Sequence, residues 1–337
     1  MRHLFALILL LIALPGWGYS VGSQQLILQD NPQQRKLKVR LFYPSSSEAR
    51  PHREGDNHVF EGFNALADAP VAQGKFPLIL LSHGSGGNNT SLAWLAVPLA
   101  ASGAIVIAAN HPGSTTGDSR PDTRITLQTR DLSFLLTHFL QDEKWRKAID
   151  PRTVGAIGHS KGGYSVLALA GGQITKQRLV NYCRMMPQMP DCTFYRRGHL
   201  PPEKWDAADL AGDFTDPRVS FVVAIDPGMS YAFTPVSLRG IHIPVLTIAA
   251  GYYIHDQPPI NLGVNRLPLP RLSLPQAGHF DFLPLCQPDA EKILAQEGEA
   301  FICQTPRSQR EAIHQQTVAA IRRFIWHNSM AATPPGH

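Results

Sequence analysis

Five short, almost uninterrupted apolar runs along the middle of the chain constrain its fold more than any other feature. A strand that is buried on both faces needs such a run, because both alternating sets of its side chains lie away from water. Helical patterns separate the runs, as in residues 127–140, where Leu132, Leu135 and Phe139 fall on one face. Buried strands that alternate with helices predict an α/β domain with a mainly parallel sheet. The five runs are residues 76–81, 104–109, 153–157, 219–225 and 245–249.

Three further segments extend this pattern toward both ends of the chain. Residues 38–43 alternate between polar and apolar, which predicts a half-buried strand, and residues 271–274 predict one more strand. Ser308 and Glu311 have the spacing of a capping box, so we expect a C-terminal helix to begin there and to continue through Trp326. These elements place residues 21–330 in one domain of central sheet and flanking helices, followed by a flexible tail at 331–337.

Two stretches are too long to be simple connections. Residues 44–74 are polar and predict a long surface connection. Residues 173–217 separate a predicted helix from a predicted strand, where an α/β unit needs only a few residues. Long connections of this kind often form lids or binding loops, so the second stretch predicts a lid-like insertion.

The first twenty residues have the pattern of a secretory signal peptide. Arg2 precedes an apolar run at residues 4–14, and Pro15, Gly16 and small residues follow it. The run is short for a bilayer span, although a membrane anchor or a buried strand is the alternative. The pattern predicts removal of residues 1–20 and a mature protein in the periplasm or outside the cell.

The four cysteines form two local groups. Cys183 and Cys192 lie in the insertion, whereas Cys286 and Cys303 lie near the C-terminal helix. Export favours disulfides, and among the three possible connectivities we expect the local one, Cys183–Cys192 with Cys286–Cys303. Four free buried thiols are the alternative.

Charge and motifs disfavour several classes of ligand. Lys and Arg exceed Asp and Glu by 31 to 26, for a net charge of +5, but the basic residues are scattered and form no stripe for nucleic acid. No phosphate-binding G-x-G-x-x-G follows a strand, and no His, Cys or Asp spacing matches a metal site. We therefore expect no nucleic acid, nucleotide, cofactor or metal.

A G-x-S-x-G pattern supplies the first candidate for chemistry. It spans residues 158–162, directly after a predicted buried strand and before a helical run at residues 164–170. This context is typical of a nucleophile elbow, in which the serine occupies a tight turn between strand and helix. The candidate nucleophile is Ser160.

A serine nucleophile needs a base, and the base needs a carboxylate to orient it. In folds with a nucleophile elbow the acid and the histidine follow the serine in that order, each after a strand. Asp226 stands directly after the run at 219–225, with Asp256 as the alternative acid. His279 follows the last predicted strand and is the candidate base. His255 and His242 are alternatives that come early for the usual order.

The loop after the run at 76–81 is the candidate source of an oxyanion hole. It reads Ser-His-Gly-Ser-Gly-Gly over residues 82–87, and such small residues let backbone N–H groups turn toward a substrate oxygen. We expect the backbone of Ser85 and of Lys161 to donate, with Gly84 as the alternative to Ser85. His83 is expected to have a structural role in this loop.

Taken together, these motifs resemble those of α/β-hydrolases. Within that fold they are most similar to the platelet-activating-factor acetylhydrolase group and its bacterial relatives, often labelled predicted dienelactone hydrolases. The resemblance extends over residues 37–327, and an acid after the strand next to the nucleophile strand is a mark of the group, which favours Asp226. The motifs are His83-Gly84-Ser85-Gly86, Asn110-His111-Pro112-Gly113, Gly158-His159-Ser160-Lys161-Gly162-Gly163, Ile225-Asp226-Pro227 and Gly278-His279-Phe280-Asp281-Phe282.

The resemblance implies a function and also has two departures. It implies that Ser160 is the nucleophile, His279 the general base and acid, and Asp226 the orienting acid of an esterase or lipase-like enzyme acting on a small-molecule or lipid ester. True dienelactone hydrolases use a cysteine where this chain has Ser160, and Lys161 replaces a residue that is often apolar. An acyltransferase with the same triad and a non-catalytic binding protein are the alternatives.

Overall fold

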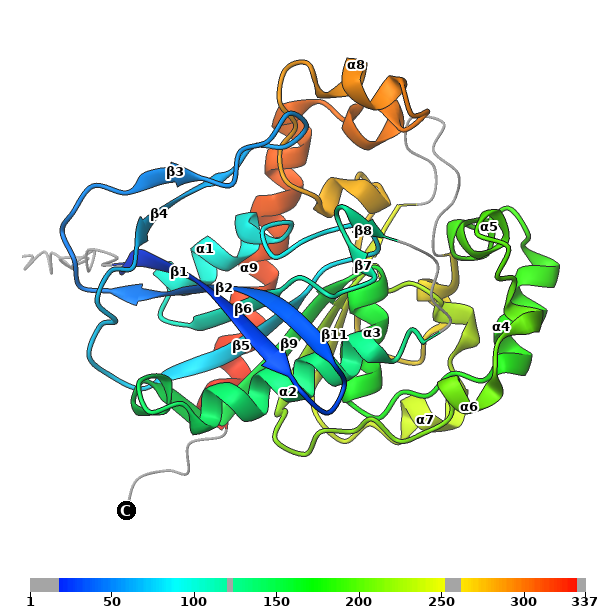
Figure 1. Cartoon of the computed structure of the whole chain (residues 1–337), viewed down its shortest axis with the longest axis horizontal. Coiled ribbons are helices and arrows are strands. Elements are labelled where there is room, and N and C mark those ends of the chain that lie inside the picture. Colours follow the sequence, from blue (N-terminus) through cyan, green and yellow to red (C-terminus); the bar gives the residue numbers. More distant parts are fainter. Residues whose placement is uncertain (1–17, 120–123, 252–261, 332–337) are drawn as a thin grey trace, which may run out of the picture.

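A ten-stranded sheet forms the centre of the computed structural model, which describes residues 18–119, 124–251 and 262–331 (Figure 1). The strands from β12 to β6 run parallel, β2 joins β6 antiparallel, and the N-terminal strands complete the edge. In sheet order the strands are β12 (Arg271–Leu274), β11 (Val245–Ala250), β10 (Phe221–Ile225), β9 (Ile149–His159), β5 (Phe76–Ser82), β6 (Ile105–Ala109), β2 (Arg35–Ser45), β1 (Ser20–Asp30), β4 (Phe63–Ala67) and β3 (His52–Glu54).

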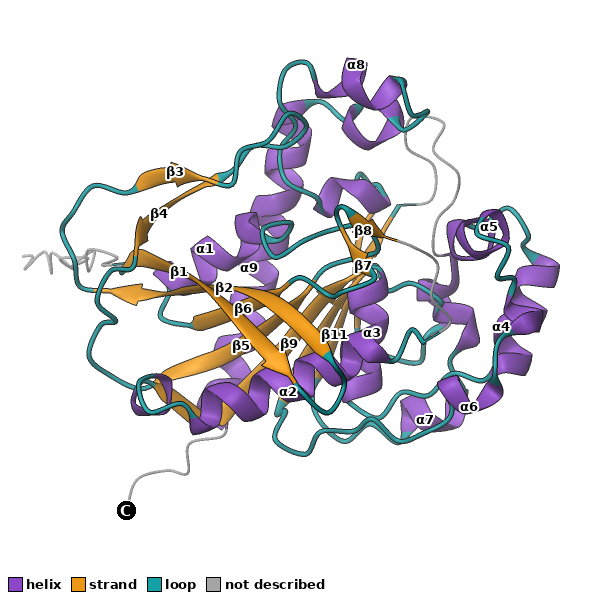
Figure 2. Ribbon diagram, viewed as in Figure 1, coloured by secondary structure: helices purple, strands orange, loops and turns teal. Residues whose placement is uncertain are grey.

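Helices cover both faces of the sheet, so that each central strand is buried on two sides (Figure 2). Along β5, Leu78 and Leu80 pack toward α2 (Leu127–Gln141) and α3 (Lys161–Leu169). Ile79 and Leu81 belong to the opposite core, which includes α1 (Ala93–Ala101) and α9 (Arg307–Ala331). Burial of each such side chain stabilises the fold by about 1.5–3 kcal/mol, so continuous apolar runs are favoured at these positions.

The predicted strands and their mainly parallel arrangement are confirmed, and two details are wrong. The helix α9 begins at Arg307, so Ser308 lies inside it rather than at its N-cap. Glu311 does not complete a capping box but forms a salt bridge with Arg307, with 2.9 Å between Oε1 of Glu311 and Nε of Arg307.

The polar segment 44–74 is more than a surface connection, because it contains β3 and β4. Phe63 and Ala65 of β4 are buried, and β4 pairs with β1 in the same sheet. This short strand is not evident from the sequence, because its surroundings are polar and it has only five residues.

The insertion between α3 and β10 folds mainly into helices, seen in green on the right of Figure 1. A disulfide joins Cys183 to Cys192, and so α4 to α5, while a second joins Cys286 to Cys303. This is the pairing predicted from the sequence. The insertion contains α4 (Lys176–Met185), α5 (Pro190–Arg197), the 3-10 turn η2 (Pro202–Lys204) and α6 (Ala207–Leu210).

The remaining elements are short and mostly line the loops at the ends of the sheet. They are β7 (Ser114–Thr115), β8 (Asp118–Ser119), α7 (Pro235–Arg239), α8 (Ala290–Ala295) and the 3-10 turns η1 (Trp145–Lys147), η3 (Ser230–Ala232), η4 (Leu262–Arg266), η5 (His279–Phe282) and η6 (Ala300–Cys303). Of the helices in the described parts of the chain, none is long and apolar enough to cross a membrane. The expected signal peptide lies outside the described residues, except for residues 18–20, and so does nearly all of the expected tail.

Candidate active site

Ser160, His279 and Asp226 meet at the carboxyl ends of the parallel strands. Ser160 follows β9, Asp226 follows β10 and His279 follows β12. Nε2 of His279 lies 3.0 Å from Oγ of Ser160, and Nδ1 of His279 lies 2.6 Å from Oδ2 of Asp226. When Nδ1 donates its hydrogen to Asp226, Nε2 is the acceptor that the Ser160 hydroxyl needs. The arrangement can remove a proton from the serine and hold the histidine ring in place.

The backbone at Ser160 makes the sharp turn that the glycine pattern predicts. Ser160 has φ 56° and ψ −119°, a conformation that side-chain-bearing residues rarely adopt. A Cβ on Gly158 would lie 2.1 Å from the carbonyl oxygen of Gly162. A Cβ on Gly162 would lie 2.0 Å from the carbonyl oxygen of Ser82. Strand, turn and helix therefore pack too closely for any other residue at these two positions, and this packing holds Ser160 in its turn.

The carboxylate of Asp226 is buried and held on both oxygens. Oδ1 accepts a hydrogen bond from the backbone N–H of Ala250 at 3.1 Å, while Oδ2 faces His279. The alternatives Asp256 and His255 lie outside the described residues. The third alternative, His242, is exposed and precedes β11, so it lies at the amino ends of the parallel strands, opposite the end at which Ser160 lies.

Residues that the sequence analysis did not select support the turn that carries His279. Asp281 accepts from the backbone N–H of Gly278 at 2.7 Å and from the buried Arg310 at 3.2 Å. His159 donates from Nε2 to the carbonyl oxygen of His279 at 3.0 Å. Burial, and next the charge of His279, lower the pKa of His159 well below its usual range, so this ring is neutral. Both His159 and Asp281 belong to motifs quoted above, and this membership is the sequence feature that points to them.

The loop after β5 lies against the candidate nucleophile, as an oxyanion hole requires. A Cβ on Gly84 would lie 2.9 Å from Cβ of Ser160, so the backbone here passes directly beside the serine. Lys161 is the first residue of α3, and backbone N–H groups at a helix N-terminus favour negative charge. The side chain of Lys161 turns aside and donates to Oγ of Ser114 at 3.2 Å. The backbones of Gly84 or Ser85 and of Lys161 can thus approach one substrate oxygen.

A second Ser–His–Asp arrangement lies behind that loop. Ser82 Oγ is 3.1 Å from Nε2 of His111, whose Nδ1 is 2.9 Å from Asp131. Asp131 also accepts two hydrogen bonds from Arg35, each at 2.6 Å. Gln128 donates to Ser82 at 2.9 Å and to the backbone oxygen of the next residue at 2.7 Å, which ties the loop to α2. This arrangement is not evident from the sequence, because its three members come from a strand, a loop and a helix that lie far apart along the chain.

His83 also holds this loop from inside. Its Nδ1 donates to the carbonyl oxygen of Gly84 at 2.7 Å, and its Nε2 accepts from the backbone N–H of His111 at 3.3 Å. Burial is the main cause of a pKa well below the usual value, so His83 is neutral. These contacts give it a structural place in the loop.

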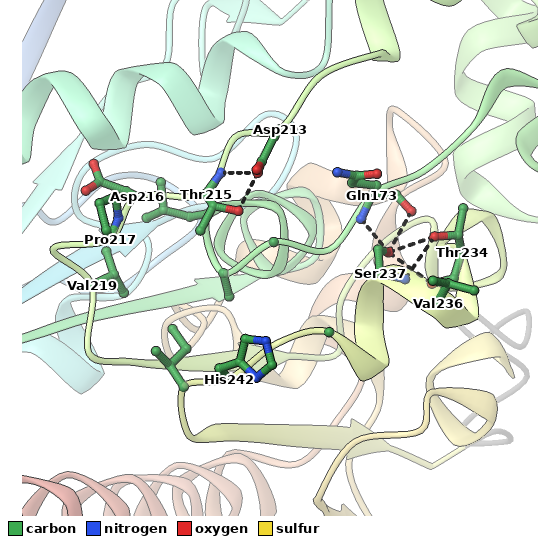
Figure 3. Close-up of a pocket in the computed structure, with 15 residues that line it drawn as sticks. Gln173, Asp213, Thr215, Asp216, Pro217, Val219, Thr234, Val236, Ser237 and His242 are labelled. Atoms are coloured by element: carbon green, nitrogen blue, oxygen red, sulfur yellow. Dashed lines mark hydrogen bonds between the residues drawn. The ribbon is translucent and has the colours of Figure 1, made fainter.

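A cavity of about 430 Å³ lies away from these residues, at the C-terminal end of α3, where Leu169 lines it. Figure 3 shows the residues around this cavity. Gly171, Thr215 and Ser237 line it together with His242. Because Ser160 precedes α3 and the cavity begins at its C-terminal end, a helix of nine residues, about 13 Å, separates them. Among the residues that the structure describes, no group of three or more His, Cys, Asp or Glu could hold a metal ion.

Comparison with known proteins gives partial matches to named enzymes. A family model described as Chlorophyllase matches residues 62–186, which contain the loop after β5 and Ser160 but neither Asp226 nor His279. Cutinase est1 of Thermobifida alba is 33% identical over 141 residues, which are 42% of this chain and 45% of that protein. Cutinase est2 of the same organism is also 33% identical over 141 residues, or 44% of its length. The chain thus matches less than half the length of these curated relatives.

Solved structures match the chain as well, and the one described here matches almost all of it. It is a ferulic acid esterase from Streptomyces cinnamoneus, with a TM-score of 0.59 and 22% identity over 92% of this chain and 91% of that one. Identity at this level reports on the fold. The chain has the α/β-hydrolase fold.

Proposed function

We propose that the protein is a serine hydrolase that cleaves carboxylic esters. The observation that carries this proposal is the hydrogen-bonded series Ser160–His279–Asp226, with 3.0 Å and 2.6 Å between its members. Its serine stands on a strained turn after β9. The similarity to proteins named cutinase, and to a structure named ferulic acid esterase, favours an ester as the substrate.

In this proposal His279 accepts the proton of Ser160 while Oγ attacks the ester carbonyl. Asp226 keeps Nδ1 of the ring as the donor and stabilises the imidazolium that forms. The alcohol leaves with the proton from His279, which yields an acyl-enzyme. Water then attacks the acyl group with His279 again acting as the base, and Ser160 is regenerated.

The negative charge on the carbonyl oxygen is stabilised by the backbone N–H groups of Lys161 and of Ser85 or Gly84. One such donor contributes about 2.7–4 kcal/mol to the stabilisation of the transition state in related chemistry. The start of α3 adds a favourable dipole at the same point.

We further propose that the mature protein acts in the periplasm or outside the cell. The N-terminal apolar run supports export, and the two disulfides fit an oxidising compartment. Strand β1 begins at Ser20, the last residue of the expected signal peptide.

A series of chromogenic esters with increasing acyl length tests the activity and selects the substrate. The wild type should hydrolyse at least the short esters, whereas Ser160→Ala should lose at least about 10⁴-fold in kcat, because no other group replaces the nucleophile. Addition of an acceptor alcohol during turnover separates hydrolysis from acyl transfer by the products formed. Equal turnover by the wild type and Ser160→Ala would refute the proposal, and no turnover of any ester would favour a binding protein.

A further inference from the structure

The insertion reaches into the site through one carboxylate. Asp191 lies in the first turn of α5, and its Oδ2 accepts from the backbone N–H of Met229 at 3.0 Å and from the hydroxyl of Tyr182 at 3.1 Å. Its Oδ1 lies 3.4 Å from the point where a Cβ on Gly228 would stand, and the backbone nitrogen of Lys161 lies 3.4 Å from that same point. The carboxylate and the backbone of Lys161 thus lie on two sides of Gly228.

The segment that Asp191 contacts is the loop that carries the proposed triad acid. In this loop Asp226 has φ 41° and Met229 has φ 54°, values that residues with a side chain rarely adopt. A loop with two such residues needs outside contacts to hold it. Gly228 donates from its backbone to the carbonyl oxygen of Ser160 at 2.8 Å, so a shift of this loop would reach both Asp226 and the nucleophile.

Asp191 is itself fixed by a rigid unit within the insertion. Tyr182 and Asp191 each directly precede one of the bridged cysteines, Cys183 and Cys192, which are fully buried. The ring of Tyr182 also stacks on Tyr231, next to the same loop, at 5.2 Å between centroids. The Cys183–Cys192 bridge therefore holds the Tyr182 hydroxyl close to the Asp191 carboxylate.

The pKa of Asp191 depends on its burial and on the charged groups of the proposed triad. Burial is the largest cause of a raised pKa for Asp191, and the two hydrogen bonds from Met229 and Tyr182 oppose it. The charges of His279 and Asp226 also act on it, in opposite directions. Asp191 is therefore within electrostatic range of both residues.

We propose that Asp191, held by Tyr182 and the Cys183–Cys192 bridge, is a positioning residue for the loop from Asp226 to Met229. Through this one side chain, the part of the insertion around the bridge then supports the loop that carries the proposed triad acid. This inference rests on the proposed function, because it assigns to Asp191 an effect on the alignment of Asp226 with His279.

The experiment compares Asp191→Ala with Asp191→Asn in turnover of a short chromogenic ester. Asp191→Ala removes the acceptor of the Met229 N–H, so we expect kcat to fall about tenfold while KM stays within about twofold. Asp191→Asn keeps an oxygen that can accept the same hydrogen bonds, so it should retain most of the wild-type kcat. Asp206→Ala is the matched control, because Asp206 caps α6 in the same insertion through the N–H of Ala208, at 2.9 Å, and should leave kcat unchanged.

Tyr182→Phe is the milder variant if Asp191→Ala does not fold. It keeps the stacked ring and removes only the hydroxyl, so kcat should fall about threefold at unchanged KM. Equal kcat values for the Asp191, Tyr182 and Asp206 variants would overturn the inference. A raised KM at unchanged kcat would also overturn it, because Asp191 would then contact the substrate directly. Turnover by the wild type and by Asp206→Ala tests the proposed function separately from the role of Asp191.

Discussion

Two Ser–His–Asp series begin at the ends of the neighbouring strands β5 and β9, and the hydrogen-bond distances within them hardly differ. In the series Ser160–His279–Asp226 the separations are 3.0 Å and 2.6 Å, and in the series Ser82–His111–Asp131 they are 3.1 Å and 2.9 Å. We call them the elbow series and the buried series.

The two series differ in backbone, access and partners. Ser160 stands on a strained turn beside the start of α3, whereas Ser82 is the last residue of the regular strand β5. All three side chains of the buried series are inaccessible, and Arg35 neutralises Asp131 with two hydrogen bonds. Hydrogen-bond geometry alone therefore does not define a nucleophile. Access to substrate and nearby oxyanion donors separate the proposed catalytic series from the structural one.

Replacement of Asp226 in the elbow series and of Asp131 in the buried series should give the largest difference between the two series. Asp226→Asn should lower kcat about 10⁴-fold, because His279 loses the carboxylate that orients it, with little change in stability. Asp131→Asn should cost about 3 kcal/mol in the free energy of unfolding, because Arg35 is left without its buried partner, and should change kcat only slightly. Ester turnover and urea unfolding of both variants measure the two effects.

The opposite pattern would break the comparison. If Asp131→Asn abolished turnover in a fully folded protein, the buried series would belong to the catalytic machinery. If Asp226→Asn kept its activity, another acid would orient His279.

The buried histidines should make the stability depend on pH. Burial is the main cause of the lowered pKa of His111, with Arg35 acting in the same direction and Asp131 against it. Burial likewise lowers the pKa of His314, on α9, to about 4. The unfolded chain binds these protons near pH 6.5 and the folded chain does not, so the free energy of unfolding falls as the pH drops below about 6.5.

For His314 the window runs from about pH 6.5 to about pH 4 and carries up to about 3 kcal/mol. The variant His314→Gln can still donate toward the carbonyl oxygens of Asp281 and Leu283, and it does not titrate. Thermal unfolding between pH 7 and pH 4 should therefore show a smaller loss for this variant than for the wild type. An identical pH dependence of both proteins would show that the pKa of His314 is the same in the folded and the unfolded chain.

The sequence predicts the elbow series and misses the buried one for physical reasons. A nucleophile elbow needs glycines at fixed positions around its serine, and Gly158 and Gly162 have no room for a side chain. Ser82, His111 and Asp131 lie on a strand, a loop and a helix, and only the packing of α2 against the sheet brings them together. No local spacing records such a contact.

The same reasoning applies to the sheet and the disulfides. Central strands such as β5 and β9 are buried on both faces and leave continuous apolar runs. Strands β1 and β4 include exposed residues and leave no such run, so the sequence does not reveal them. The bridges were predicted because their cysteines are only 9 and 17 positions apart. The role of Asp191 could not be predicted, because its contact with Met229 joins residues that are 38 positions apart, one before β10 and one after it.

Covalent labelling with a fluorophosphonate, followed by mass spectrometry of the labelled peptide, tests the central claim most directly. Only an activated and accessible serine attacks such a probe at a useful rate. We expect the phosphonyl group on Ser160 in the wild type and in Ser82→Ala, and no labelling of Ser160→Ala. A label on Ser82, or unchanged labelling of Ser160→Ala, would contradict the assignment of catalysis to the elbow series.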